Sequence, residues 1–327
     1  MTARHHRTCR NHPVRFGLAA LLGAGIAALM APPPAQAQMP SDLVEKIAAM
    51  GRVVDPENTG KLYAPLQEKE PYAGVKVTRD VKYGSDARNV VDIFVPEAGP
   101  AGRAVLMFVH GGGMIRGIKR GPGSAFYDNV MLFAARHNMV GVNVEYRLAP
   151  QFPWPAGNED LAAAIRLVAD KAADFGADPN RIFLMGHSAG ATHVASYVSH
   201  PEFHGSKGSG LAGAILSSGG YDFTTKDDLS EGRIAYFGTD PALLAQRSAV
   251  AGLIKTKIPF MMSAAELDPP PIAAQSALLK DALCKSEHGC VRSIVLPHHS
   301  HMSESYALNT ADHLLSDQIL EFVKTGK

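Results

Sequence analysis

The chain has 327 residues, of which 46% are hydrophobic and 19% are charged, a composition typical of a globular protein with a sizeable core. That length allows one large domain or two ordinary ones. The formal net charge of +1 excludes the strongly basic character that favours nucleic-acid binding, so we expect no nucleic-acid partner.

Residues 1–37 have the three-part order of a secretory signal peptide. Four arginines precede the apolar run of residues 16–30, and Ala35 and Ala37 then stand in the A-x-A spacing of a cleavage site. The apolar run is too short to span a bilayer comfortably, which makes an uncleaved membrane anchor the weaker alternative. The sequence therefore predicts cleavage after Ala37, export to the periplasm or the medium, and no stable membrane insertion afterwards.

Cleavage would also change the charge of the chain. The whole sequence has 32 basic and 31 acidic residues, and residues 1–37 hold four arginines and no acidic residue. The mature chain would therefore keep 28 basic residues and a net charge of −3. The basic cluster belongs to the targeting signal and predicts no binding surface.

Residues 38–74 are expected to form a cap-like segment, with a short amphipathic helix near residues 41–54. Two alternating stretches then predict strands that start a sheet in antiparallel fashion, at residues 75–83 and 89–96. From residue 103, short apolar strands alternate with amphipathic helices. Strands are expected at 103–110, 139–148, 181–186, 211–219, 258–266 and 291–298. Helices are expected at 124–138, at 158–176, directly after Ser188, at 271–285 and within 303–324. This alternation predicts an α/β fold with a mostly parallel central sheet and helices on both faces.

Three glycines follow His110 at the end of the first long apolar strand. Acyl transfer builds a negative charge on oxygen, and its stabilisers must be donors that are fixed beforehand. Glycine N–H groups can approach a substrate without an intervening side chain. The run therefore predicts an oxyanion loop, with Gly112 and Gly113 as donors and the N–H of Ala189 as a third.

The segment Gly186-His187-Ser188-Ala189-Gly190 lies between a predicted strand and a predicted helix. A G-x-S-x-G sequence in that context is a nucleophile elbow, in which a tight turn holds the serine above the edge of the sheet. The two glycines allow close approach of neighbouring backbone. Ser188 is therefore the predicted nucleophile.

The segment 221–257 interrupts the alternation of strands and helices. It is long, polar in its first half, and lies between two strand ends. A segment of that kind predicts a lid or substrate-lining insertion within a catalytic domain that spans residues 75–327.

A nucleophilic serine needs a base and an acid that orients the base, in the chain order Ser, Asp or Glu, His for this fold. Asp268 is the favoured acid because it follows a strand end, where side chains reach the carboxyl edge of the sheet. Asp222, one strand earlier, is the alternative. His301 is the favoured base and His299 its competitor, because both follow the strand at 291–298.

The two cysteines outside the signal peptide, Cys284 and Cys290, predict a local disulfide in an exported protein. Zinc is a weak alternative both for this pair, which has His288 between its members, and for the histidine cluster around His301. We therefore expect no metal site.

Taken together, the segments HGGG, NVEYRLAP, GHSAG, ELDP and HHSHMS resemble the α/β-hydrolases of the hormone-sensitive-lipase type, in particular the feruloyl and acetyl esterase-like branch. The resemblance spans roughly residues 75–325. It implies a Ser188–His301–Asp268 triad and an oxyanion hole of Gly112, Gly113 and Ala189. His110 and Arg147 would be structural supports. The chain departs from the family at Met114, where an aromatic residue is common, and at residues 297–301, where Gly-His-x-His is common.

The resemblance implies hydrolysis of short-chain or aromatic carboxylic esters through an acyl-enzyme intermediate, with no cofactor. An arylformamidase-like amidase and a peptidase of the same fold are the alternatives among enzymes, and a non-catalytic binding protein is the alternative of another class. The expected partner is a small-molecule or polymer-derived ester substrate. The natural ester and the oligomeric state are not readable from the sequence.

Overall fold

The computed structural model describes residues 38–225 and 230–327. The chain divides into a unit of Met1–Ala35 and a unit of Gln36–Lys327. The predicted signal peptide and its cleavage site lie outside the described residues. Within the described ranges, no helix combines the length and the apolar character needed to cross a membrane.

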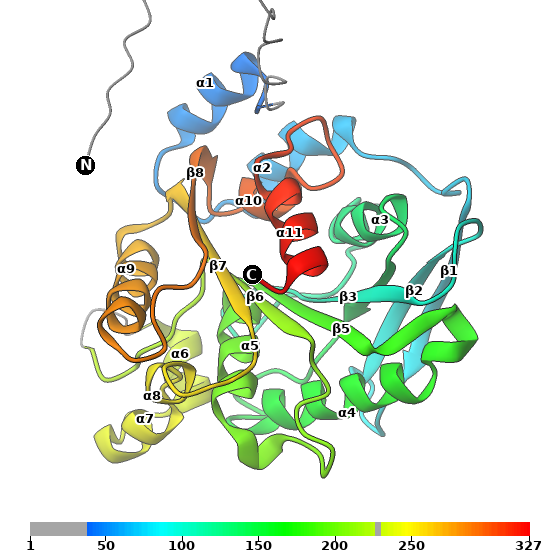
Figure 1. The fold of residues 1–327 in the computed structure, drawn as a ribbon. Helices are drawn as coiled ribbons and strands as arrows, with labels where there is room; N and C mark the ends of the chain where they lie inside the picture. The colour runs from blue at the N-terminus through cyan, green and yellow to red at the C-terminus, as the bar shows by residue number, and fades with distance from the viewer. Residues whose placement is uncertain (1–37, 226–229) are drawn as a thin grey trace, which may run out of the picture. The chain divides into compact units, whose positions relative to one another are not determined.

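A single eight-stranded sheet organises the second unit (Figure 1). Its strand order is β1-β2-β4-β3-β5-β6-β7-β8. β2 pairs in antiparallel fashion with both neighbours, and every other pairing is parallel. The strands are β1 (Val75–Lys82), β2 (Val90–Pro96), β3 (Arg103–Val109), β4 (Val140–Val144), β5 (Ala177–His187), β6 (Gly213–Ser217), β7 (Phe260–Leu267) and β8 (Ser293–Ser300). The predicted mostly parallel sheet with an antiparallel start is confirmed.

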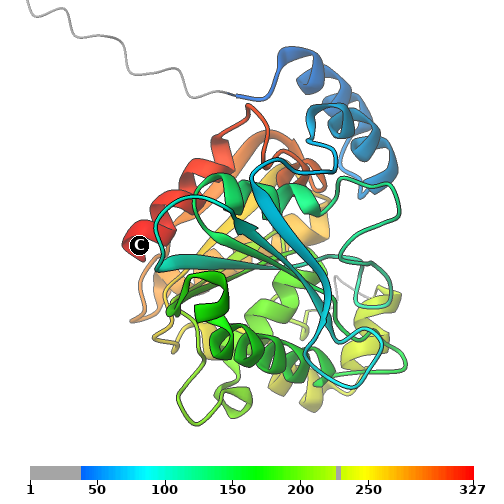
Figure 2. The ribbon, with the colours of Figure 1, turned by 90° about the vertical axis from the view of Figure 1, so that its right-hand side faces the viewer.

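Helices cover both faces of this sheet, because its central strands carry apolar side chains on both sides. In β3, Leu106 and Phe108 join one core, and Val105 and Met107 join the other. The first core is closed by α1 (Ser41–Met50), α3 (Asp128–Arg136) and α11 (Leu314–Thr325), and the second by α4 (Ala156–Asp170), α5 (Ala189–Ser199) and α9 (Pro270–Lys285). Figure 2 shows α11 and α4 on opposite sides of the strands.

The N-terminal segment adds α2 (Pro56–Tyr63) and a 3-10 turn (Ala64–Leu66) after α1. Leu43, Ile47 and Tyr63 are buried in the same core as Phe108. α1 packs against β8, and α2 packs against the short helix α10 (Ser303–Tyr306) that follows β8. This segment therefore lies over the elements that carry the predicted base.

The helices expected near 41–54 and at 124–138 are shorter in the structure, at Ser41–Met50 and Asp128–Arg136. Two other predicted helical stretches end or divide at a residue with left-handed φ. The helix expected over 158–176 ends at Asp170, and a 3-10 turn (Ala172–Phe175) continues to Gly176, which has the left-handed φ of 63°. The helix expected within 303–324 is divided into α10 and α11. Asn309 lies between them at φ 64°, a conformation that no α-helix continues through.

In residues 221–257, the described parts 221–225 and 230–257 contain three short helices, α6 (Glu231–Phe237), α7 (Pro241–Arg247) and α8 (Val250–Leu253). Figure 1 shows them beside α5, on the same side of the sheet as α9. Together we call residues 221–257 the covering segment. Four of its apolar residues join a separate small cluster with Ala189 at the start of α5: Phe223, Tyr236, Phe237 and Leu244.

Candidate active site

Ser188 lies at the junction between β5 and α5, as expected. Its backbone has φ 58° and ψ −125°, a conformation that non-glycine residues rarely adopt and that is typical of strained functional positions. Its N–H donates to the carbonyl of Ser217 at 2.9 Å, which ties the turn to the end of β6. Ser188 is half-buried, whereas its neighbours in β5 and α5 are buried.

The two glycines of this turn are required by close backbone contacts. A Cβ added to Gly190 would lie 2.0 Å from the carbonyl oxygen of Val109, and one added to Gly186 would lie 2.3 Å from that of Gly190. No side chain fits at either position. The pattern of glycines around Ser188 is therefore explained by packing of α5 against the ends of β3 and β5.

The glycine loop after β3 lies against the serine turn. A Cβ on Gly111 would come within 2.9 Å of the Ser188 Cβ. Gly112 and Gly113 have φ values of 127° and 60°, which favour glycine. The N–H of Ala189 belongs to the first turn of α5, whose N–H groups have no partner within the helix. Both groups of predicted oxyanion donors therefore come from segments that border Ser188.

His110 and Glu145 support the start of the glycine loop. The Nε2 of His110 lies 3.0 Å from Oε1 of Glu145, and its ring stacks on Tyr146 with centroids 4.4 Å apart. Burial raises the pKa of Glu145, but hydrogen bonding to His110 and to the N–H of Lys119 lowers it by more. Arg147, the other predicted support, donates to Oδ1 of Asp160 at 2.8 Å.

Asp268 and His301 meet behind the serine turn. Oδ1 of Asp268 lies 2.7 Å from Nδ1 of His301, and both side chains are completely buried. The Nε2 of His301 is buried and has no hydrogen-bond partner within the described ranges. The neighbour of Ser188, His187, contacts His301 directly, with ring centroids 4.7 Å apart and Nε2 2.7 Å from the His301 carbonyl.

The competing histidines have other partners. Nδ1 of His299 lies 3.1 Å from the Ser303 hydroxyl, and its Nε2 lies 3.0 Å from Oδ2 of Asp312. His298 is exposed, and its N–H donates to the carboxylate of Glu266. Within residues 38–225 and 230–327, neither of these two histidine rings hydrogen-bonds to Asp268, which distinguishes both from His301.

The competing acid, Asp222, is also engaged elsewhere. Its Oδ1 accepts hydrogen bonds from the N–H and the hydroxyl of Thr224, at 2.9 and 2.7 Å. These bonds close a local turn at the start of the covering segment. Asp222 therefore caps a loop, while Asp268 contacts a histidine.

Four polar residues behind the triad were missed by sequence reasoning: Ser217, Ser218, Ser263 and Glu304. Ser218 donates to Oδ2 of Asp268 at 2.7 Å, and Ser263 lies 2.5 Å from Oε1 of the buried Glu304. Burial, followed by repulsion from Asp268, raises the pKa of Glu304 to about 8. The signal that could have found Ser217 and Ser218 is their position at the carboxyl end of the parallel strand β6.

A small apolar cluster borders the oxyanion loop and the serine turn. It consists of Met114, Ala149, Ala189, Phe223, Tyr236, Phe237 and Leu244. Phe223 and Phe237 stack with ring centroids 3.9 Å apart. A Cβ on Gly232 of α6 would lie 1.7 Å from the carbonyl oxygen of Gly113, so α6 packs directly on the oxyanion loop. We call these seven residues the apolar cluster.

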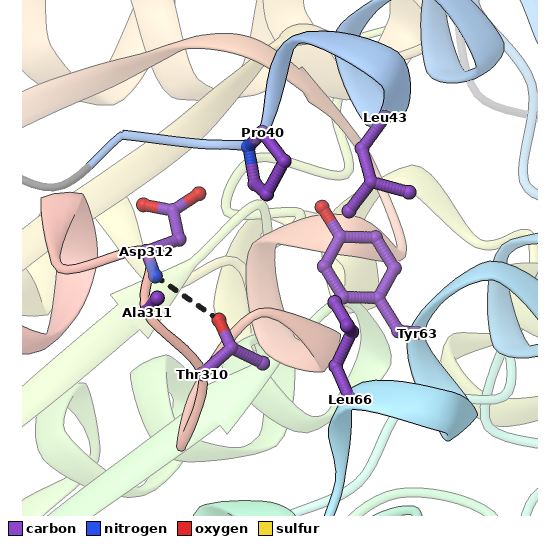
Figure 3. Close-up of a pocket in the computed structure, with 7 residues that line it drawn as sticks. All are labelled: Pro40, Leu43, Tyr63, Leu66, Thr310, Ala311 and Asp312. Atoms are coloured by element: carbon purple, nitrogen blue, oxygen red, sulfur yellow. Dashed lines mark hydrogen bonds between the residues drawn. The ribbon is translucent and has the colours of Figure 1, made fainter.

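A separate cavity of about 240 Å³ lies under the N-terminal segment (Figure 3). Its lining is mainly apolar and consists of Pro40, Leu43, Tyr63, Leu66, Thr310, Ala311 and Asp312. None of the predicted site residues lines it. Asp312 links the cavity to the histidines near the site, because it lines the cavity and also contacts the ring of His299.

Two further predictions concern sulfur and metal chemistry. The structure places the sulfur atoms of Cys284 and Cys290 2.07 Å apart, at the end of α9. In the part of the chain that the structure describes, no group of three or more His, Cys, Asp or Glu side chains is arranged to hold a metal ion.

The sheet order, the serine turn and the buried His–Asp pair together define an α/β-hydrolase fold. A family model described as the alpha/beta hydrolase fold matches residues 106–276, more than half of the chain. The chain therefore belongs to this family of α/β-hydrolases, and the predicted resemblance to the hormone-sensitive-lipase type is confirmed.

Curated relatives match parts of the chain. Phenmedipham hydrolase from Pseudarthrobacter oxydans is 37% identical over 117 residues, which are 34% of this chain and 23% of that protein. Esterase LipQ from Mycobacterium tuberculosis is 26% identical over 75% of this chain and 62% of its own length. The chain thus spans about a quarter to three fifths of these relatives.

Solved structures share the fold over a larger fraction of the chain. Esterase B from Lactobacillus rhamnosis superposes with a TM-score of 0.69, at 15% identity, over 86% of this chain and 94% of that chain. At that identity the likeness establishes the fold alone.

Proposed function

We propose that this protein is a serine carboxylesterase that hydrolyses its substrate through an acyl-enzyme intermediate. The observation that carries the proposal is the completely buried contact between Asp268 and His301, formed beside the strained turn that presents Ser188. An Asp that fixes one nitrogen of an imidazole leaves the other nitrogen to take the proton of a nucleophile. The names of several relatives, esterases and hydrolases, support the same reaction class.

In this mechanism the Nε2 of His301 takes the proton of the Ser188 hydroxyl as the oxygen attacks the ester carbonyl. Asp268 holds the imidazole in the tautomer with a proton on Nδ1 and stabilises the imidazolium that forms. The imidazolium then gives its proton to the departing alcohol. Water repeats the attack on the acyl-enzyme, and the acid is released.

The negative oxygen of each tetrahedral intermediate would be bound by the N–H groups of Gly112, Gly113 and Ala189. Donors fixed before the reaction stabilise this charge most effectively, because they need no reorganisation during the reaction. The positive φ of both glycines and the position of Ala189 at the start of α5 support this role. The N-terminal end of α5 adds a partial positive charge near the same oxygen.

The substrate class that the site favours is a short-chain or aromatic ester. The apolar cluster supplies Met114, Phe223 and Phe237 beside the oxyanion loop, and α6 packs on that loop at Gly232. Apolar and aromatic side chains with a few polar groups are typical of small-ligand sites. We include the covering segment, residues 221–257, in the catalytic domain as its lid, and residues 38–74 as a cap-like segment.

The same proposal includes export of the enzyme. A chain cleaved after Ala37 would begin at Gln38 and enter an oxidising compartment, where Cys284 and Cys290 would form their disulfide. Mass spectrometry of the protein purified from a host with a secretion pathway tests both points. A retained N-terminus, or two free thiols in the exported protein, would contradict this part.

The activity is tested with p-nitrophenyl acetate, butyrate, octanoate and palmitate, using the wild-type protein beside Ser188→Ala. We expect hydrolysis of the shorter esters and a loss of at least about 10³-fold in kcat in the variant. A folded wild-type protein without activity on any of these esters would reject the carboxylesterase. Serine-dependent activity on amide or peptide substrates alone would instead assign the amidase or peptidase alternative.

A further inference from the structure

The carboxyl group of Glu304 lies directly behind the triad and takes no part in the mechanism above. It is completely buried on α10, three residues after His301. Its two oxygens contact the hydroxyls of Ser218 and Ser263. A buried carboxyl group normally requires a partner that neutralises or shares its charge.

No cation faces Glu304 in the part of the chain that the structure describes. The nearest histidine is His187 of β5, whose Nε2 lies 4.0 Å from Oε2 of Glu304. That nitrogen donates to the His301 carbonyl, and burial followed by repulsion from His301 holds the pKa of His187 well below its usual value. His187 is therefore neutral and does not offset a charge on Glu304.

The other titratable groups around Glu304 are acidic or neutral. Asp268, after β7, repels a charge on Glu304, and Tyr221, after β6, is a buried phenol whose pKa is raised. The elements packed against α10 contribute Tyr63 from α2 and Tyr127, which lies just before α3 and faces Tyr306. Both phenols are neutral, because burial raises their pKa.

The decisive observation is a count of protons on Ser218. Its hydroxyl has one proton, yet its oxygen is in hydrogen-bond contact with two carboxyl groups, Oδ2 of Asp268 at 2.7 Å and Oε2 of Glu304. If both groups were carboxylates, one contact would bring two acceptor oxygens together without a proton. One additional proton, on Glu304, gives each of the two contacts a donor. Glu304 then donates to Ser218, and Ser218 donates to Asp268.

Ser263 is satisfied by the same arrangement. Its oxygen lies 2.5 Å from Oε1 of Glu304 and 2.9 Å from the Ser217 hydroxyl. Because Ser263 has one hydroxyl proton, a hydrogen bond donated to Glu304 leaves its oxygen to accept from Ser217. Oδ2 of Asp268 then accepts hydrogen bonds from the Ser218 hydroxyl and from the N–H of Ala265. Oδ1 of Asp268 remains as the acceptor for His301. We call Ser217, Ser218, Ser263, Glu304 and Asp268 the polar network.

We propose that Glu304 is a positioning residue of the catalytic site, which carries a proton at neutral pH and, through Ser218, holds the carboxylate of Asp268 in place for His301. The inference rests on the proposed function, because the role of Asp268 does. A group that orients the acid acts on the chemical step rather than on substrate binding. Loss of the proton would leave Ser218 shared between two carboxylates and would loosen Asp268.

The first test measures the proton directly in the full-length protein. Glutamate labelled with ¹³C at its side-chain carboxyl is followed by NMR across a pH titration, in wild type, Glu304→Gln and the control Glu266→Gln. We expect one resonance, absent only from Glu304→Gln, that titrates near pH 8. The His301 Nδ1 proton should shift with the same midpoint in wild type and not in Glu304→Gln. A Glu304 resonance that titrates at the ordinary carboxyl pKa of about 4.3 would overturn the proposal.

The second test asks whether the neutral hydrogen bonds are what matters. With p-nitrophenyl acetate at neutral pH, we expect Glu304→Ala to lose at least about tenfold in kcat with little change in KM. Glu304→Gln, which can donate to Ser218 and accept from Ser263, should recover most of that loss. Ser218→Ala should resemble Glu304→Ala. Equal losses in the Ala and Gln variants would overturn the positioning role.

The two proposals fail in different ways. If no serine-dependent hydrolysis is found but the Glu304 and His301 resonances titrate together near pH 8, the carboxylesterase is rejected and the protonated network stands. If wild type is an active esterase and its Glu304 is ionised at neutral pH, the network is rejected and the carboxylesterase stands.

Discussion

The two regions that border the predicted triad are opposite in chemistry. Behind it, the polar network packs two carboxyl groups and three hydroxyls into a fully buried space. In front of it, the apolar cluster packs the covering segment onto the oxyanion loop. The polar network tolerates little change, because each buried polar atom depends on a specific partner. The apolar cluster depends on shape and volume, and such surfaces accept substitution more readily.

The comparison predicts the largest effect for Asp268→Asn. The amide holds His301 in the wrong tautomer, so we expect kcat to fall by about 10³- to 10⁴-fold with a small change in KM. The measurement is steady-state hydrolysis of p-nitrophenyl acetate. Glu266→Gln, at the end of β7 two residues before Asp268, is the matched control, because this exposed carboxylate accepts a hydrogen bond from the backbone N–H of His298. We expect the control to lose no more than about threefold in kcat. Equal losses in both variants would remove Asp268 from the triad.

The polar network also predicts how stability depends on pH. Because the folded-state pKa of Glu304 is raised to about 8, the native state binds one more proton than the unfolded state between roughly pH 4.3 and 8. The free energy of unfolding should therefore fall as pH rises through this window. Relative to Glu304→Gln, wild type should lose on the order of 3 kcal/mol between pH 5 and 8.

Urea unfolding of wild type and Glu304→Gln at several pH values measures this difference. Glu159→Gln is the control, because that exposed carboxylate pairs with Arg147 at the surface and should not change the slope. Parallel stability curves for wild type and Glu304→Gln would mean that Glu304 is ionised in the folded protein.

In the region in front of the triad, Gly232→Ala should have the strongest effect. The new Cβ would lie 1.7 Å from the carbonyl oxygen of Gly113, so α6 or the oxyanion loop must move. We expect kcat to fall by about 10- to 100-fold, because displaced donors lose much of their effect on the transition state. The control is Gly60→Ala in α2, where the added Cβ makes only ordinary contacts and helix propensity favours Ala. Unchanged kinetics in Gly232→Ala would show that the loop does not depend on α6.

The smallest effect is expected for Met114→Ala. Removing this side chain enlarges the apolar cluster beside the oxyanion loop, so longer acyl chains should gain relative to acetate. A change of one or two methylene groups in an apolar site alters kcat/KM by about tenfold. The measurement is the ratio of kcat/KM for octanoate and acetate, with the exposed Ile118→Ala as control. An unchanged ratio would place the acyl group elsewhere.

The sequence by itself determined the fold and predicted the positions to which we assign the chemistry. The alternation of apolar strands with amphipathic helices predicted the sheet, because a parallel strand that is buried on both faces must be apolar throughout. Gly186 and Gly190 predicted the turn at Ser188. The structure gives the reason, because the carbonyl oxygens of Val109 and Gly190 leave no room for a Cβ at these two positions. Strand ends pointed to Asp268 and His301, because side chains there gather at one edge of the sheet.

Only the tertiary structure decided which neighbours these residues have. Three histidines lie within four residues, His298 and His299 in the last part of β8 and His301 just after it. The path of the chain directs the ring of His299 to Asp312 and the ring of His301 to Asp268. Sequence spacing cannot give this, because side chains in a loop point wherever the packed elements allow. The sequence also did not predict a role for Glu304, because a glutamate in a short helix is usually exposed. Only its burial brings it to the hydroxyls of Ser218, just after β6, and Ser263, in β7.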